Sequence, residues 1–261
     1  GVITDLGGMV AALYKRGLPF IHVPTTVLGM VDAAIGGKNG VDFMGLKNQI
    51  GSVSMPELVW IAPNYIDTLN KRQLINGFAE MLKHALIADQ KHWQALNNIN
   101  PENPDALKKH ILTSALIKKQ IVQIDPFEKK GRLFLNFGHT IGHAIESALI
   151  QAQKPILHGE AVALGMLLES YLSTQLKGLS NAEFLSIKNC LLKLYPQISI
   201  DEQLKTSILA FIKHDKKALS SGLRMVLLES IGKPVIQHDI SNKVVENCLN
   251  WYQTEIGNQL A

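Results

Sequence analysis

The chain has 261 residues, of which 46% are hydrophobic and 18% charged, a composition typical of a globular protein with one large or two modest domains. Its formal net charge is only +4, and its lysines occur in short pairs rather than long basic runs, so no nucleic-acid surface is predicted. No apolar run is long enough for a membrane span, and the first residues lack the pattern of a signal peptide.

Residues 1–8 are glycine-rich and typical of the second half of a turn from a strand into a helix. The helix that follows has an apolar face and is predicted to end near Arg16 and Gly17. Such a turn can hold the pyrophosphate of a dinucleotide, and a plain helix cap is the alternative interpretation. Residues 20–24 and 58–62 are short apolar runs bounded by proline, which predicts two buried parallel strands with helical structure between them.

From residue 64 onward the apolar residues recur every three or four positions, which predicts helices. A two-stranded ribbon over residues 223–236 is the one predicted exception. We therefore expect a boundary near Pro63, with an α/β domain over residues 1–63 and a mainly helical domain over residues 64–261. The predicted helices span residues 71–88, 105–123, 138–149, 159–176, 181–194, 201–213 and 242–253.

Residues 136–160 contain three histidines whose spacing suits a metal site. His139 and His143 are four apart, so on a helix both imidazoles project from one face, and His158 opens a second predicted helix. The zinc-protease motif does not fit, because Thr140 stands where that motif has its general-base glutamate. The three histidines therefore predict a metal centre of another kind, with a further ligand from elsewhere.

A carboxylate ligand is available upstream at Glu80, in an apolar helical segment that also carries Lys83 and His84. One carboxylate with two imidazoles is a zinc set that leaves a coordination position for substrate. The alternative is that Glu80 and Lys83 form a solvated helix pair and that the histidines are ordinary core or cap residues. His84, one turn beyond Glu80, also competes as a ligand on spacing alone.

Six short motifs follow one another along the chain, at residues 23–26, 31–38, 45–51, 77–80, 136–146 and 157–160. Their order and spacing resemble the 3-dehydroquinate synthase family over essentially the whole chain. The resemblance implies the remnant of a parallel α/β (Rossmann-like) NAD-binding domain, without the family's N-terminal portion, followed by a mainly helical metal-binding domain.

The resemblance also implies a role for individual residues. The family's ligands for Zn²⁺ or Co²⁺ match Glu80, His139 and His158. Its catalytic positions match Asp32, Lys83 and His143, of which His143 faces the substrate and is not a ligand. Positions that line the substrate match Lys38, Lys47, Asn48, Lys118, Arg132, Asn136 and one of the pair Lys216 and Lys217. Positions that contact NAD match Asp5, Thr25, Thr26, Leu28, Tyr65 and Thr68, and Lys47 is assigned to the cofactor as well.

The activity implied is the conversion of 3-deoxy-D-arabino-heptulosonate 7-phosphate to 3-dehydroquinate and phosphate, in the shikimate pathway to aromatic amino acids. Bound NAD oxidises one hydroxyl transiently, which acidifies the neighbouring C–H bond and permits phosphate elimination. The metal acts as a Lewis acid, with Asp32 and His143 as the proton-transfer groups. Several lysines and arginines suit a substrate that carries both a carboxylate and a phosphate.

The implied partners are this small sugar acid phosphate and a second copy of the chain, with no nucleic acid and no membrane. In such a homodimer Arg16 reaches across the interface towards the phosphate group. Only two cysteines occur, Cys190 and Cys248, without zinc-ribbon spacing, which fits a reducing cytoplasm.

Three alternative functions remain open on the sequence. Another sugar-phosphate cyclase shares the metal and NAD residues but lacks partners for a substrate carboxylate, and the presence of Lys118 and Arg132 favours the carboxylated substrate. Arg132 is placed by its distance from His139, because Gly131 lies one position later than the family pattern expects. A metal-dependent polyol dehydrogenase has the same two-domain plan and performs net redox chemistry. A metal-binding helical module without activity is the third.

Overall fold

The computed structural model describes residues 1–43, 46–218 and 223–257, and the side chains of residues 42–49 and 214–222 fall outside the description. The chain divides into two compact units. The first comprises residues 1–84 and 94–132, and the second residues 85–93 and 133–261. The boundary expected near Pro63 stays a prediction, because compactness alone does not show where a dinucleotide-binding domain ends.

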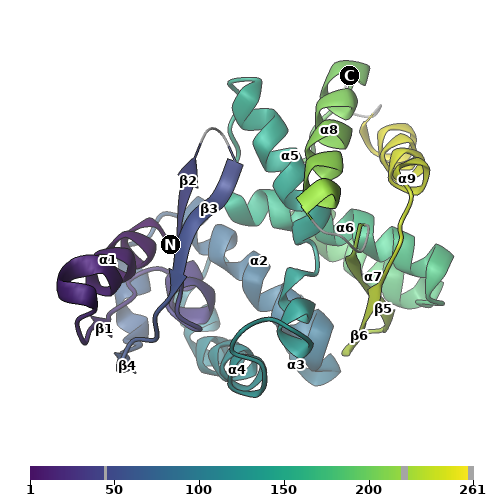
Figure 1. The fold of residues 1–261 in the computed structure, drawn as a ribbon. Helices are drawn as coiled ribbons and strands as arrows, with labels where there is room; N and C mark the ends of the chain where they lie inside the picture. Colours follow the sequence, from purple (N-terminus) through teal and green to yellow (C-terminus); the bar gives the residue numbers. More distant parts are fainter. Residues whose placement is uncertain (44–45, 219–222, 258–261) are drawn as a thin grey trace. The chain divides into compact units, whose positions relative to one another are not determined.

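The first unit contains the two predicted parallel strands, β1 (Ile21–His22) and β4 (Leu58–Val59). They pair in parallel with Ile21 opposite Leu58, so their pairing is confirmed. The expectation that both are buried is wrong, because the side chains of Ile21 and Leu58 are both more than half exposed. This short pair is the parallel α/β part of the fold (Figure 1).

The segment between these strands was expected to be helical, and this expectation is mostly wrong. It contains one π-helical turn, η2 (Gly29–Ala33), followed by an antiparallel hairpin of β2 (Lys38–Phe43) and β3 (Leu46–Val53). Gly36 and Gly37 separate the two with φ angles of 105° and 65°. These left-handed angles end the helical turn at little cost only because both residues are glycines.

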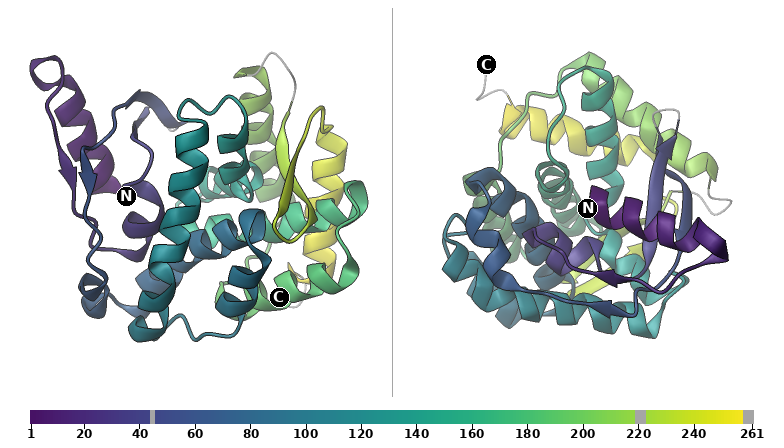
Figure 2. Two further views of the ribbon diagram at one scale, coloured as in Figure 1. Left: turned by 90° about the horizontal axis from the view of Figure 1, so that it is seen from below. Right: turned by 90° about the vertical axis from the view of Figure 1, so that its left-hand side faces the viewer.

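The glycine-rich start of the chain is also helical rather than a turn. Helix α1 (Val2–Leu13) includes Gly7 and Gly8, and a short 3-10 helix, η1 (Tyr14–Arg16), follows it. A Cβ added at Gly8 would lie 2.0 Å from the side-chain oxygen of Asn39 on β2. Gly8 therefore allows the hairpin to run close beside α1, as Figures 1 and 2 show.

The helices after residue 63 agree with the periodicity, with one omission. The 3-10 helix η3 (Pro63–Thr68) precedes α2 (Lys71–Ala88), and α4 (Pro104–Ile124) begins after Asn103, whose side chain accepts a hydrogen bond from the Asp105 amide. Helix α3 (Gln90–Asn97) was not predicted. Only Asp89 separates it from α2, so the periodic pattern does not mark the break.

The second unit is built around a long buried helix, α6. Its consecutive residues from Gly159 to Ser170 are all buried, as expected for a helix that other elements cover on every side. The β5–β6 ribbon packs against it and is antiparallel, as predicted (Figure 2). The elements of this part are η4 (Gly131–Asn136), α5 (His139–Gln151), α6 (His158–Leu176), α7 (Asn181–Leu194), α8 (Glu202–Ala218), β5 (Met225–Ser230), β6 (Lys233–Gln237) and α9 (Asn242–Glu255).

The predicted fold class, a small parallel α/β part with a mainly helical remainder, is confirmed. Among the described helices, none has the length together with the apolar character that crossing a membrane requires.

Helices α5 and α6 cross with their backbones in direct contact. A Cβ added at Gly165 of α6 would lie 1.9 Å from the carbonyl oxygen of Gly138 and 2.8 Å from the amide nitrogen of Gly142. No real Cβ atom fits at such distances, so the crossing requires glycine at position 165. This contact brings the first turn of α5 against α6.

We expect Gly165→Ala to lower the free energy of unfolding by about 1–3 kcal/mol, because the added methyl group meets backbone that cannot move aside without opening the crossing. Gly7→Ala is the matched control. Nothing lies within 4 Å of the methyl group it would add, so it should raise stability by about 0.5–1 kcal/mol through helix propensity. Urea unfolding followed by circular dichroism measures both, and a Gly165→Ala variant as stable as the wild type would contradict the close crossing.

Candidate active site

In the first unit, Glu80, Lys83 and His84 lie on one face of α2, and none of these polar residues is more than 1% exposed. The ammonium group of Lys83 forms an ion pair with the carboxylate of Glu80. The alternative interpretation, a solvated pair of Glu80 and Lys83, is therefore partly wrong. The two residues do form an ion pair, but the pair is buried.

Asp32, on η2, completes this cluster from another element. Its Oδ1 atom lies 2.7 Å from Nζ of Lys118 on α4 and 3.6 Å from Nζ of Lys83. Nζ of Lys118 also donates to the backbone carbonyl of Asp32 at 2.6 Å. Burial alone would raise the pKa of Asp32, but Lys118 and then Lys83 outweigh it and hold this pKa well below 3.8. Asp32 is therefore a carboxylate at neutral pH.

His84, which competes with the predicted ligands on sequence spacing alone, also belongs to this cluster. Its Nε2 atom lies 3.6 Å from Oδ1 of Asp32, and burial lowers its pKa. Asp32, Glu80 and His84 offer ligand atoms within 4.8 Å of one another, a spacing that a metal ion could use. Lys83 contacts both carboxylates of this group, and Lys118 contacts Asp32. A metal ion held by Asp32, Glu80 and His84 together would be repelled by these two ammonium groups, so this group of three suits lysines better than a metal ion.

Two further predicted substrate residues of the first unit contact the protein itself. The guanidinium of Arg132, only 2% exposed, donates to the carbonyl of Gly36 at 2.8 Å and to that of Pro126 at 2.5 Å. The ammonium group of Lys38 forms an ion pair with Glu128. The side chains of Lys47, Asn48, Lys216 and Lys217 lie outside the described residues.

The residues predicted to contact NAD lie on several elements of the first unit. Thr26 Oγ1 accepts a hydrogen bond from the amide of Gly29, the first residue of η2. Thr25 precedes Thr26, and Leu28 is the N-cap residue of η2. Thr68 donates to the carbonyl of Tyr65 within η3.

The other two predicted residues lie near the start of the chain. Asp5 lies in α1, where burial raises its pKa, and Arg16 ends η1 with a φ angle of 67°. The contacts with NAD that the resemblance implies stay predictions.

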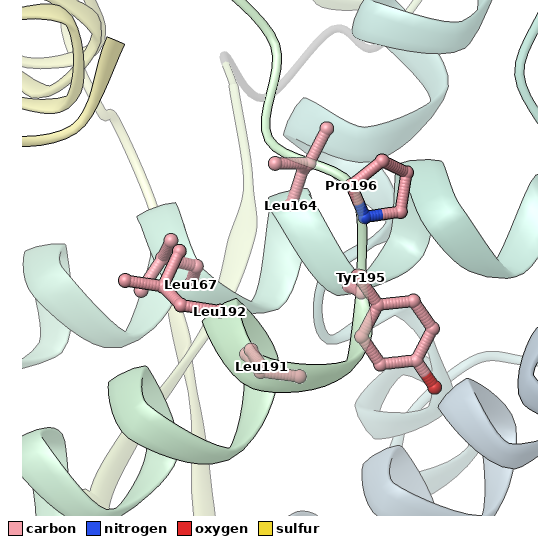
Figure 3. Close-up of a pocket in the computed structure, with 7 residues that line it drawn as sticks. Leu164, Leu167, Leu191, Leu192, Tyr195 and Pro196 are labelled. Carbon is pink, nitrogen blue, oxygen red and sulfur yellow. The ribbon is translucent and has the colours of Figure 1, made fainter. Parts of the chain in front are cut away.

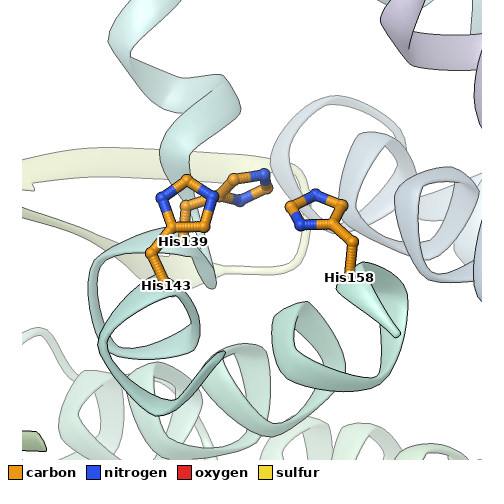
Figure 4. Close-up of side chains that lie close together, drawn as sticks. All are labelled: His139, His143 and His158. Atoms are coloured by element: carbon orange, nitrogen blue, oxygen red, sulfur yellow. The ribbon is translucent and has the colours of Figure 1, made fainter. Parts of the chain in front are cut away.

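The three predicted histidines come together in the second unit. His139 and His143 lie one turn apart on α5, and His158 begins α6; all three rings point into the same space (Figure 4). The ring centroids are 5.0 Å apart for His139 and His143, 5.5 Å for His139 and His158, and 5.6 Å for His143 and His158. Their ligand atoms lie within 4.8 Å of one another, as a shared metal ion requires.

Hydrogen bonds orient two of these rings in the way typical of metal-binding histidines. Nδ1 of His139 lies 3.1 Å from the carbonyl oxygen of Phe137, and Nδ1 of His158 lies 3.3 Å from Oε2 of Glu146. A hydrogen on each Nδ1 directs the lone pair of the ring to Nε2. The residues present therefore fit a divalent metal ion bound through imidazole nitrogens.

Glu146 is the residue of this site that sequence reasoning missed. It is buried and follows His143 by three positions on α5, within the motif at residues 136–146. A carboxylate beside a metal-site imidazole is a common arrangement, so the spacing alone could have indicated it. Asn136, predicted to line the substrate, ends η4 just before Phe137 and is partly buried.

An apolar hollow lies elsewhere in the second unit, against α6 and the end of α7 (Figure 3). Its cavity volume of about 10 Å³ is at the lower limit for a single water molecule. It therefore has no room for a sugar phosphate. It is lined by Ala163, Leu164, Leu167, Leu191, Leu192, Tyr195 and Pro196.

Comparison with known proteins identifies the family. Residues 1–76 match the family model described as 3-dehydroquinate synthase N-terminal, and residues 77–218 match the one described as 3-dehydroquinate synthase C-terminal. The chain belongs to the 3-dehydroquinate synthase family. A 3-dehydroquinate synthase of Parabacteroides distasonis is 37% identical over 259 residues, which are 98% of this chain and 73% of that protein.

Two solved structures of other synthases resemble this member of the 3-dehydroquinate synthase family. The 2-epi-5-epi-valiolone synthase of Streptomyces hygroscopicus, solved with NAD⁺ and Zn²⁺, is 30% identical with a TM-score of 0.82, over 95% of this chain and 70% of that one. A 2-deoxy-scyllo-inosose synthase, solved with carbaglucose-6-phosphate, NAD⁺ and Co²⁺, is 27% identical with a TM-score of 0.81, over 94% and 70% of the two chains.

We expect Lys118→Met to raise the pKa of Asp32, because the burial that opposes ionisation remains while the nearest cation is lost. The folded-state pKa of Asp32 lies below its unfolded value near 3.8, so its charge stabilises the fold above that pH, and this contribution disappears as the pH falls. The variant should therefore unfold at a higher pH during acid titration.

Carboxyl ¹³C NMR of Asp32 measures this pKa directly. Lys119→Met is the matched control, since Lys119 is the exposed neighbour of Lys118 on α4. An unchanged Asp32 pKa in Lys118→Met would show that the ion pair does not set it.

Proposed function

We propose that this chain is a 3-dehydroquinate synthase that converts 3-deoxy-D-arabino-heptulosonate 7-phosphate to 3-dehydroquinate and phosphate, with NAD and a divalent metal ion. The match to both halves of the family's model over residues 1–218 is the observation that carries the proposal. The buried cluster supports it, because Lys83 and Lys118 both lie beside Asp32, and the resemblance gave a role to all three residues.

We propose Glu80, His139 and His158 as the ligands of the metal ion, Zn²⁺ or Co²⁺. The orientation of His139 and His158 by Phe137 and Glu146 supports this choice. The resemblance places His143 on the substrate side, and we propose that role for it. The bound ion supplies a Lewis acid for a substrate oxygen. The two solved synthases that contain Zn²⁺ or Co²⁺ support a divalent ion in this family.

The low pKa of Asp32 bears on how the proposed proton transfers are divided. A carboxylate with a depressed pKa is a weak base, and Asp32 is held by two lysines. We therefore propose that Asp32 mainly orients Lys83 and Lys118 for the anionic substrate. His143, whose imidazole can donate or accept a proton, is then the better candidate for proton transfer. Lys38, Arg132 and Asn136 are proposed to bind the substrate.

The remaining parts of the proposal concern the cofactor, the partner and the compartment. NAD is proposed to contact Asp5, the turn of Thr25, Thr26 and Leu28, and the η3 residues Tyr65 and Thr68, and the two solved synthases contain NAD⁺. A homodimer with Arg16 at its interface is proposed from the resemblance alone. Cys190 and Cys248 are buried free thiols, which supports a cytoplasmic location.

The activity is tested with the full-length gene product. It should release phosphate from 3-deoxy-D-arabino-heptulosonate 7-phosphate in the presence of catalytic NAD⁺, without accumulation of NADH, because the hydride returns within each turnover. Phosphate assay and NADH absorbance distinguish this from a polyol dehydrogenase, which accumulates NADH. Equally fast phosphate release from an analogue without the carboxylate would favour another sugar-phosphate cyclase.

The metal assignment makes a separate prediction. Glu80→Ala, His139→Ala and His158→Ala should each lose the bound metal ion, because each removes one proposed ligand. His143→Ala should keep its metal ion and lose roughly 10²–10⁴-fold in rate as a proton-transfer variant. Elemental analysis of the purified proteins measures the metal, with His238→Ala as a control at an exposed histidine. Loss of metal in His143→Ala but not in His158→Ala would reverse the assigned roles.

A further inference from the structure

The start of helix α5 lacks an ordinary cap. The first N–H groups of a helix have no partner within the helix, and a polar side chain at the N-cap position usually accepts from them. Here the N-cap residue is Gly138, which has no side chain and a φ angle of 78°. A Cβ at this position would lie 2.5 Å from Cγ of Met166, so no serine, threonine or aspartate fits there.

The missing acceptors come from Glu169 of α6. Its Oε2 atom accepts a hydrogen bond from the Gly138 amide at 2.6 Å, and its Oε1 atom accepts from the Ile141 amide at 3.1 Å. The Glu169 side chain is completely buried. Burial raises its pKa to about 8 despite these N–H donors, so this position is unfavourable for a charged carboxylate. Stability alone is therefore a weak reason for a glutamate here.

Glu169 shares a face of α6 with other parts of the histidine site. On α6, residue 165 lies about two turns after residue 158, and residue 169 lies about one turn after residue 165. The three residues therefore lie along one side of the helix. His158 carries one imidazole, Gly165 makes the close crossing with α5, and Glu169 binds the first turn of α5. That first turn begins with His139.

We propose that Glu169 is a positioning residue for the metal site, which fixes the first turn of α5 on α6 and thereby sets the placement of His139 relative to His158. This inference rests on the proposed function, since it assumes that these histidines bind a metal ion. Glu169 touches neither metal nor substrate in this role. It acts through the backbone amides on either side of His139.

Glu183 is a matched control elsewhere in the same unit. Its Oε1 atom accepts from the Ile231 amide at 3.0 Å, and its Oε2 atom accepts from the Ser180 amide at 3.3 Å at the start of α7. Like Glu169, Glu183 accepts hydrogen bonds from two backbone amides. It lies on α7, and neither of these amides belongs to the first turn of α5. Removing it should cost stability without changing the histidine site.

The test compares Glu169→Gln, Glu169→Met and Glu183→Met in the full-length gene product. Cobalt affinity is measured by competition with a chelator, the visible spectrum of the bound Co²⁺ reports its geometry, and urea unfolding reports stability. We expect Glu169→Met to bind Co²⁺ roughly 10–100-fold more weakly with an altered spectrum, as is typical when a residue that orients a ligand is lost. Glu169→Gln keeps one acceptor oxygen and should fall between Glu169→Met and the wild type.

The outcomes separate this inference from the proposed function. Glu183→Met with wild-type Co²⁺ affinity, beside a weakened Glu169→Met, supports positioning by Glu169. Unchanged affinity and spectrum in both folded Glu169 variants overturn the inference and leave the metal site intact. Equal loss of affinity in Glu183→Met and Glu169→Met also overturns it, because the effect then follows stability alone. A wild-type protein without Co²⁺ affinity overturns the proposed metal site and this inference together.

Discussion

The close crossing of α5 and α6 is the constraint on which the histidine site depends. Gly165 lets the two backbones touch, and the crossing places the first residue of each helix, His139 and His158, near the other. Side chains that start from rigid, touching backbones have few ways to rearrange. The separation of 5.5 Å between these two rings is therefore a property of the helix packing rather than of mobile side chains.

The buried cluster of the first unit is held together by a different principle, charge balance. Two carboxylates, Asp32 and Glu80, face two ammonium groups, Lys83 and Lys118, so the four charges sum to zero. Each would be costly to bury alone, and each is stable there only while its partners are present. The charges are consequently fixed in orientation before any ligand binds, which is the condition for strong electrostatic effects on a bound substrate.

The sequence predicted the long helices well, because an apolar period near 3.6 continues through α2 and α7, whose limits match the prediction to the residue. It did not predict the β2–β3 hairpin, since the glycines around it interrupt any regular alternation. Spacing on one helix was enough to bring His139 and His143 together. The buried Lys83 lies beside Asp32, and Asp32 pairs with Lys118, which is 86 positions further along the chain. No local sequence pattern contains this relation.

The pairing of Lys118 with Asp32 also determines how an anion can enter this cluster. An incoming anion does not meet an unpaired positive charge, because it must share the Lys118 ammonium group with the carboxylate of Asp32, which lies 2.7 Å from it. Ion pairs in such buried positions are screened much less by dissolved salt than surface pairs are. Anion binding here should consequently vary little with ionic strength.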